Sequence, residues 1–101
     1  MLVKRKVYVP NAFSPNADGI NDEFVPFGGN DVALVRTFRI FDRQGNMVFE
    51  TADFNPGDPS HGWDGRFKGK LMQPAVFAWF AEVEFFDHKT VQYSGDVTLM
   101  K

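Results

Sequence analysis

Cysteine is absent from this chain of 101 residues, which excludes thiol catalysis, thiolate metal sites and disulfide bonds. The two histidines, His61 and His88, are too few and too far apart in the sequence to indicate a zinc site. No apolar run approaches the roughly 20 residues that a membrane-spanning helix needs. The net charge is only −2, and acidic and basic residues are mixed along the chain, so nucleic acid is not an expected partner.

Phenylalanine is the residue type that stands out, with 12 copies in the chain. Aromatic residues favour pleated, half-buried surfaces, and no stretch keeps a helical period for three turns. Turn-forming residues separate about seven short strand-like segments, which is the pattern of an antiparallel sandwich. We therefore expect one all-β domain, an immunoglobulin-like antiparallel β-sandwich of about seven strands.

The expected strands differ in length and in how clearly they alternate. Residues 11–22 are too polar for a strand, and residues 52–62 are expected to form a loop. Alternation between apolar and polar residues identifies the buried side of the longer strands. The expected strands are residues 6–10, 23–27, 32–42, 47–51, 74–86 and one or two within 90–101. The expected inward side chains are Phe38, Ile40, Phe77, Trp79, Ala81, Val83, Phe85, Val97 and Leu99, with Thr98 and Met100 outward.

No group of residues forms an enzyme signature. Asp58, Ser60 and His61 are neighbours in one loop, whereas a catalytic serine–histidine–aspartate triad draws its members from separate elements. Glu82 and Glu84 lie on one strand face about 7 Å apart, but a small sandwich offers no cleft for a sugar ring. We therefore expect no enzymatic activity and no catalytic residues.

Oxygen-bearing side chains recur at alternate positions in Ser14, Asn16 and Asp18, and a glycine follows. This spacing resembles the first half of a calcium-binding loop, although the first residue is Ser and the twelfth position holds no Glu. Calcium is thus a candidate ligand of Ser14, Asn16, Asp18 and Asp22, and no cofactor is required. In the alternative interpretation, Asn16, Asp18 and Asn21 bond neighbouring backbone N–H groups and brace the loop.

The sequence Trp63-Asp64-Gly65 also allows two interpretations. An exposed indole would offer a surface on which a sugar stacks. The alternative is a buried core tryptophan followed by a turn, in which Asp64 caps backbone donors. We favour the buried tryptophan.

Residues 9–22 read VPNAFSPNADGIND, and they resemble the opening motif of the gliding motility-associated C-terminal domain, the type B sorting domain of the Bacteroidota type IX secretion system. Matching segments follow in the same order at 40–43 with Gly45 and 48–49, at 63–65, at 69–70, at Pro74 with 76–77, and at 95–99. This sequence departs from the usual pattern in places, with Ala17 where the family has Gly and Gln44 where Trp is common. The motif residues, for which we expect a mainly structural role, are Pro10, Asn11, Phe13, Pro15, Asn16, Asp18, Gly19, Asn21, Asp22, Arg43, Gly45, Trp63, Asp64 and Gly65.

The resemblance implies a C-terminal sorting domain at residues 7–101, after residues 1–6 that are a linker or were added to the native chain. Such a domain directs a large N-terminal passenger through the periplasm and the outer membrane to the cell surface or the medium. The implied partners are the type IX translocon and outer-membrane shuttle proteins, and the domain is expected to be a monomer. The signal peptide would lie at the far N-terminus of the full protein, with Met100-Lys101 as its native C-terminus.

The terminal strand is the expected recognition element, through its edge or its exposed side chains. Two other functions stay open: an adhesive or carbohydrate-binding module with Trp63 or Trp79 as the sugar platform, and a structural cap or spacer similar to the flagellar hook-cap immunoglobulin-like domain. The expected recognition residues are Gly95, Asp96, Val97, Thr98, Leu99, Met100 and Lys101.

Overall fold

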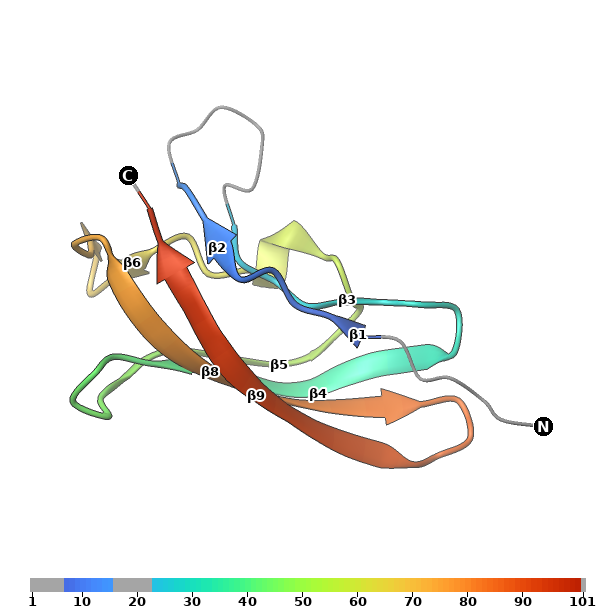
Figure 1. The fold of residues 1–101 in the computed structure, drawn as a ribbon. Coiled ribbons are helices and arrows are strands. Elements are labelled where there is room, and N and C mark those ends of the chain that lie inside the picture. The colour runs from blue at the N-terminus through green and yellow to red at the C-terminus, as the bar shows by residue number, and fades with distance from the viewer. Residues whose placement is uncertain (1–6, 16–22, 101) are drawn as a thin grey trace.

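The computed structural model describes residues 7–15 and 23–100, which form nine strands and one short 3-10 helix. The all-β expectation is confirmed. A five-stranded sheet in the order β2-β9-β8-β4-β5 forms the main layer (Figure 1). Within the described residues, no helix has the length and apolar character of a membrane span. The five strands are β2 (Ala12–Phe13), β4 (Val32–Phe41), β5 (Met47–Phe54), β8 (Ala75–Phe85) and β9 (Thr90–Leu99).

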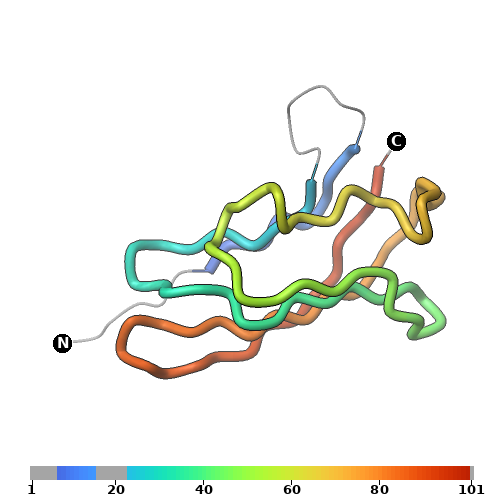
Figure 2. The backbone as a smooth tube through the Cα atoms, turned by 180° about the vertical axis from the view of Figure 1, so that it is seen from behind, coloured from blue at the N-terminus to red at the C-terminus, as the bar shows by residue number. Residues whose placement is uncertain are grey.

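A second, less regular layer covers one face of this sheet, which gives a sandwich-like arrangement (Figure 2). It contains two antiparallel strand pairs, and an isolated bridge joins Phe24 to Trp63. Because its strands are only two residues long, side-chain packing must hold this layer more than its ladders do. The elements are β1 (Val7–Tyr8) with β3 (Phe27–Gly28), β6 (Arg66–Phe67) with β7 (Lys70–Leu71), and the 3-10 helix η1 (Pro59–His61).

The chain crosses between the two layers at Pro10. β1 pairs with β3 in the second layer, whereas β2 pairs in parallel with β9 in the main sheet. Pro10 is buried and has no N–H to donate, so it ends β1 without leaving an unsatisfied donor. The β2–β9 pair is parallel, unlike the other named strand pairs of the described residues.

The prediction that residues 11–22 contain no strand is wrong for Ala12–Phe13. A polar stretch can still enter a sheet when one of its side chains is needed in the core, and Phe13 is 1% exposed. Three other boundaries differ from expectation. β5 extends to Phe54 because that side chain is buried, the predicted strand 23–27 is replaced by β3, and 66–71 forms a small hairpin.

The long strands follow the predicted alternation. In β8, the predicted inward residues from Phe77 to Phe85 are all buried, and the intervening side chains are more exposed. Phe38 and Ile40 of β4 are also fully buried, as predicted. Aromatic side chains pack together between the two layers. The centroid of the Phe13 ring lies 5.6 Å from that of Phe24 and 5.4 Å from that of Trp63. Each buried aromatic side chain contributes about 2–3 kcal/mol before the loss of entropy is counted.

Candidate functional site

The C-terminal end of β9 is divided between buried and exposed side chains. Val97 and Leu99 are 1% and 2% exposed, whereas Thr98 is exposed and Met100 is 46% exposed. The predicted inward and outward directions of all four residues are confirmed. Lys101 lies outside the described residues.

Backbone hydrogen bonds to β2 fix the position of this strand end. The Thr98 N–H donates to the Asn11 carbonyl at 2.9 Å, and the Met100 N–H donates to the Phe13 carbonyl at 2.8 Å. The opening motif therefore contributes directly to the terminal strand. The backbone edge of β9 at Thr98 and Met100 is already used, so a partner can reach this end mainly through its side chains.

Three motif segments that are distant in the sequence converge beside Leu99. Gly65 is buried with φ +82°, and a Cβ atom there would lie 3.1 Å from Pro15 and 3.2 Å from both Leu71 and Leu99. Only a residue without a side chain fits this contact and adopts this backbone conformation without strain. Gly65 thus lets the Trp-Asp-Gly turn close over the terminal strand.

Trp63 is a core residue, as the favoured interpretation predicted. It is 0% exposed, and its indole Nε1–H donates to the Arg66 carbonyl at 2.9 Å. Asp64 caps the turn, since its Oδ1 accepts from the Arg66 N–H at 3.1 Å. Trp79 is also buried, at 9% exposure. Neither indole presents a free face on which a sugar could stack.

Two surface grooves flank the end of β9, and Met100 borders both. One has a volume of about 440 Å³ and is lined by Leu71, Met72, Gln73, Pro74, Leu99 and Met100. The other has a volume of about 480 Å³ and is lined by Tyr8, Pro10, Asn11, Ala12, Phe27 and Met100. Tyr8, Phe27 and Leu71 are exposed apolar side chains, so this end of the domain carries an apolar surface around Met100.

The β4–β5 hairpin tip is held by Asp42, which the sequence patterns did not identify as a turn residue. Its Oδ1 accepts from the N–H groups of Gln44 and Asn46, each at 2.9 Å. These bonds, led by that from Asn46, hold the pKa of Asp42 below its ordinary value of 3.8. Gly45 has φ +87°, as predicted for this tip, and Arg43 is exposed.

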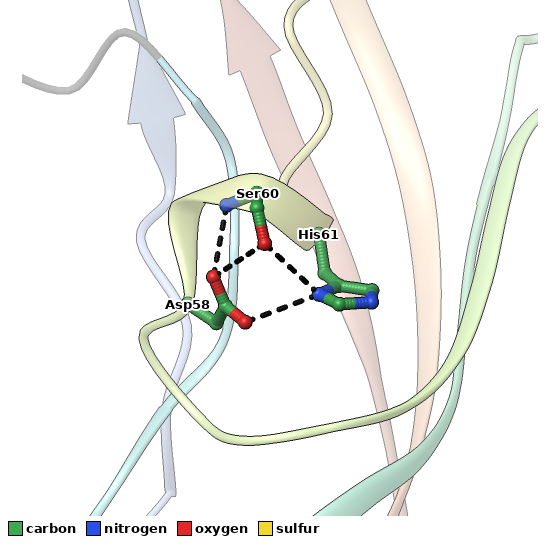
Figure 3. Close-up of polar contacts among 3 residues, drawn as sticks. All are labelled: Asp58, Ser60 and His61. Carbon is green, nitrogen blue, oxygen red and sulfur yellow. Dashed lines mark hydrogen bonds and ion pairs between the residues drawn. The ribbon is translucent and has the colours of Figure 1, made fainter.

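Asp58, Ser60 and His61 do come together, but as the cap of η1 (Figure 3). The Asp58 Oδ1 accepts from the Ser60 N–H at 3.0 Å and from the Ser60 hydroxyl at 2.7 Å. These bonds, with a smaller contribution from His61, lower the pKa of Asp58. The Nδ1 atom of His61 contacts both Asp58, at 3.2 Å, and Ser60, at 3.3 Å.

In a catalytic triad, the histidine takes a proton from the serine through one ring nitrogen and bonds the aspartate through the other. Here both neighbours share Nδ1, so the cluster matches a helix cap and not a triad. The His61 ring also stacks on Phe54, with centroids 5.1 Å apart, and is half-buried.

The calcium interpretation rests on residues that the structure does not describe, except Ser14. Asn16, Asp18, Gly19, Asn21 and Asp22 all lie outside the described residues, so this interpretation stays a prediction. Among residues 7–15 and 23–100, no group of three or more His, Asp or Glu side chains is arranged to hold a metal ion.

Comparison with known families identifies the class of domain. The chain matches the CHU_C type IX secretion signal domain family over residues 7–99. No curated protein and no solved structure matches the chain. The match covers most of the sequence, so the chain belongs to this family, in agreement with the resemblance of its opening motif.

The family defines the function as a C-terminal sorting signal of the type IX secretion system. The domain is recognised by the secretion machinery and is attached to a passenger protein. Membership of this family implies export across the outer membrane to the cell surface or the medium.

The sequence patterns did not reveal the apolar surface around Met100, because Tyr8, Phe27 and Leu71 reach it from three separate segments.

Proposed function

We propose that the secretion machinery recognises the folded domain at the C-terminal end of β9, residues 95–101. The observation that carries the proposal is the contrast between neighbouring residues: Leu99 is 2% exposed, whereas Met100 is 46% exposed and borders both grooves. Leu99 anchors the strand in the core, and Met100 offers a flexible apolar side chain to a partner. The proposed partners are the translocon and outer-membrane shuttle proteins.

In this proposal the domain acts as an address and not as a catalyst, and it works as a monomer. The carbohydrate-binding alternative lacks its two proposed platforms, because Trp63 and Trp79 are both buried. That alternative would be favoured if a passenger fused to the intact chain were not exported and the intact chain bound a glycan. Failure to export together with no glycan binding would favour a cap or spacer.

The test is delivery of a fluorescent passenger that carries an N-terminal export signal and this chain at its C-terminus. Deleting residues 96–101 would remove core residues Val97 and Leu99, so loss of delivery after this deletion could reflect unfolding. Met100→Asp is sharper, because it changes an exposed side chain. We expect it to lower surface delivery about tenfold or more, which corresponds to roughly 1.4 kcal/mol of recognition.

Met47→Asp is the matched control, because Met47 is 44% exposed and lines neither groove. It should leave delivery unchanged, and both variants should keep the wild-type melting temperature. Delivery should also stop in cells without a working type IX system. Normal delivery of the Met100→Asp fusion would show that recognition lies elsewhere on the domain.

A further inference from the structure

The edge of β9 beyond its pairing with β2 has a row of backbone groups that no described strand uses. β2 pairs only with Thr98 and Leu99, although β9 begins at Thr90. On its other side, β9 pairs with β8 without interruption from Thr90 to Leu99. Figure 1 shows β9 extending well past β2 at the front of the main sheet.

The direction of these backbone groups follows from the bonds at the strand end. Thr98 and Met100 direct their N–H groups away from β8 and towards β2. Because strand residues alternate in direction, Gln92, Ser94 and Asp96 direct their N–H and C=O groups towards the same open edge. The register with β8 has no shift that would change this alternation. Residues 90–96 therefore present a regular ladder edge about 20 Å long.

This edge lacks most of the features that usually prevent strand pairing. Residues 90–96 contain no proline, lysine or arginine, and the ladder has no bulge. The opposite edge strand, β5, is different. Its Glu50 forms a 2.7 Å ion pair with Arg39, its Asp53 has φ +54°, and the β4–β5 register is irregular at Ile40/Phe41. Among the strands that the structure describes, the contrast singles out β9 as the edge open to a partner.

The side chains beside the open edge define the chemistry of a strand that would fit there. On the inner side, Val91 and Tyr93 are half-buried and pack against the core. On the outer side, Asp96 is exposed, and Glu82 accepts a 3.4 Å hydrogen bond from Gln92. Arg36 of β4 contacts Glu84 at 3.7 Å and Asp53 at 3.6 Å, and Lys89 is exposed directly before β9. Asp96 is the one charged side chain among residues 90–96.

We infer that residues 90–96 of β9 are a strand-addition site for an extended segment of the secretion machinery. The added strand has apolar side chains facing Val91 and Tyr93 and a basic side chain facing Asp96. It continues along the same edge that β2 already occupies at Thr98 and Leu99. This inference rests on the proposed function, and it adds a second contact beside Met100.

The test uses the same passenger fusion and compares Ser94→Pro with Ser94→Ala. Proline removes the outward N–H and places its ring at the edge, while it removes no bond to β8. We expect Ser94→Pro to lower surface delivery about tenfold, as expected for losing a buried hydrogen bond and the close approach of a strand. Ser94→Ala keeps the N–H and should be delivered normally. Equal delivery of the two folded variants would overturn the inference.

Ala52→Pro is the control for proline at the other edge of the sheet. The same alternation, carried across β8 and β4, directs the Ala52 N–H away from β4. This variant should be delivered normally. Reduced delivery of a folded Ala52→Pro fusion would show that proline at any edge impairs export, and it would contradict a site specific to β9.

Asp96→Lys provides a test that does not depend on proline. Asp96 is exposed, so the melting temperature should stay within a few degrees of wild type, and a basic segment should be repelled. We expect a severalfold loss of delivery, with a smaller loss for Asp96→Asn. If Ser94→Pro fails to fold, normal delivery of Asp96→Lys overturns the inference. Failure of the wild-type fusion, or normal delivery of Met100→Asp, would instead count against the proposed function.

Discussion

Gly95 of β9 lies directly against the indole ring of Trp79, its register partner in β8. A Cβ atom on Gly95 would be 3.1 Å from both Nε1 and Cζ2 of that ring. The ring packs on the bare backbone of β9, and this contact lets a large side chain stay buried one strand away from the open edge. Glycine here serves packing, because its backbone does not need a positive φ.

Gly95→Ala tests this contact. In an unobstructed strand, alanine would stabilise the fold by lowering the entropy of the unfolded chain. Here its methyl group forces the indole to move, so we expect the free energy of unfolding to fall by about 1–2 kcal/mol. Denaturant unfolding measures the change, with Ser94→Ala as the neutral neighbour. A more stable Gly95→Ala variant would show that the indole has room to shift.

Leu99→Ala and Met100→Ala separate the anchor of β9 from its exposed end. Leu99 is 2% exposed, so its truncation should lower the free energy of unfolding by about 2–5 kcal/mol. Met100 is 46% exposed, and its truncation should change stability by less than about 0.5 kcal/mol. Urea unfolding of the two purified variants provides the comparison. Similar losses in both would contradict the division between buried and exposed residues at this end.

Trp63→Phe tests whether the Trp-Asp-Gly turn is part of the core. The change leaves a small cavity and removes the donor to the Arg66 carbonyl, for an expected loss of about 2–3 kcal/mol. Thermal and chemical unfolding should both detect it. An unchanged midpoint would be inconsistent with a fully buried indole, and would reopen the carbohydrate-binding alternative.

Acid should weaken the cap of η1. Because hydrogen bonds from Ser60 lower the pKa of Asp58, its carboxylate stabilises the fold above the ordinary value of 3.8. This stabilisation is lost as the pH falls below 3.8 through the lowered pKa. We expect Asp58→Ala to melt below wild type at pH 7, and the difference to shrink towards pH 2. Melting curves across that range measure it; a difference that persists in strong acid would rule out the carboxylate as its source.

The sequence predicted the long strands well for a simple physical reason. In β8, residues 77, 79, 81, 83 and 85 are all apolar and the residues between them include Glu82 and Glu84, which is the pattern that a strand with one buried face requires. The two-residue strands were harder, because alternation needs more residues than they have. Ala12–Phe13 forms β2 only because β9 supplies the partner, and Phe54 extends β5 because the core has space for its ring.

The sequence by itself determined the all-β class, the buried side of each long strand and the family, because alternation and motifs are local in the chain. Only the tertiary structure revealed the two surfaces to which we assign a partner. The apolar surface around Met100 joins three segments, and among the described strands the edge of β9 stays open because β2 covers just Thr98 and Leu99. Such features depend on which strands become neighbours, and local sequence patterns do not specify that.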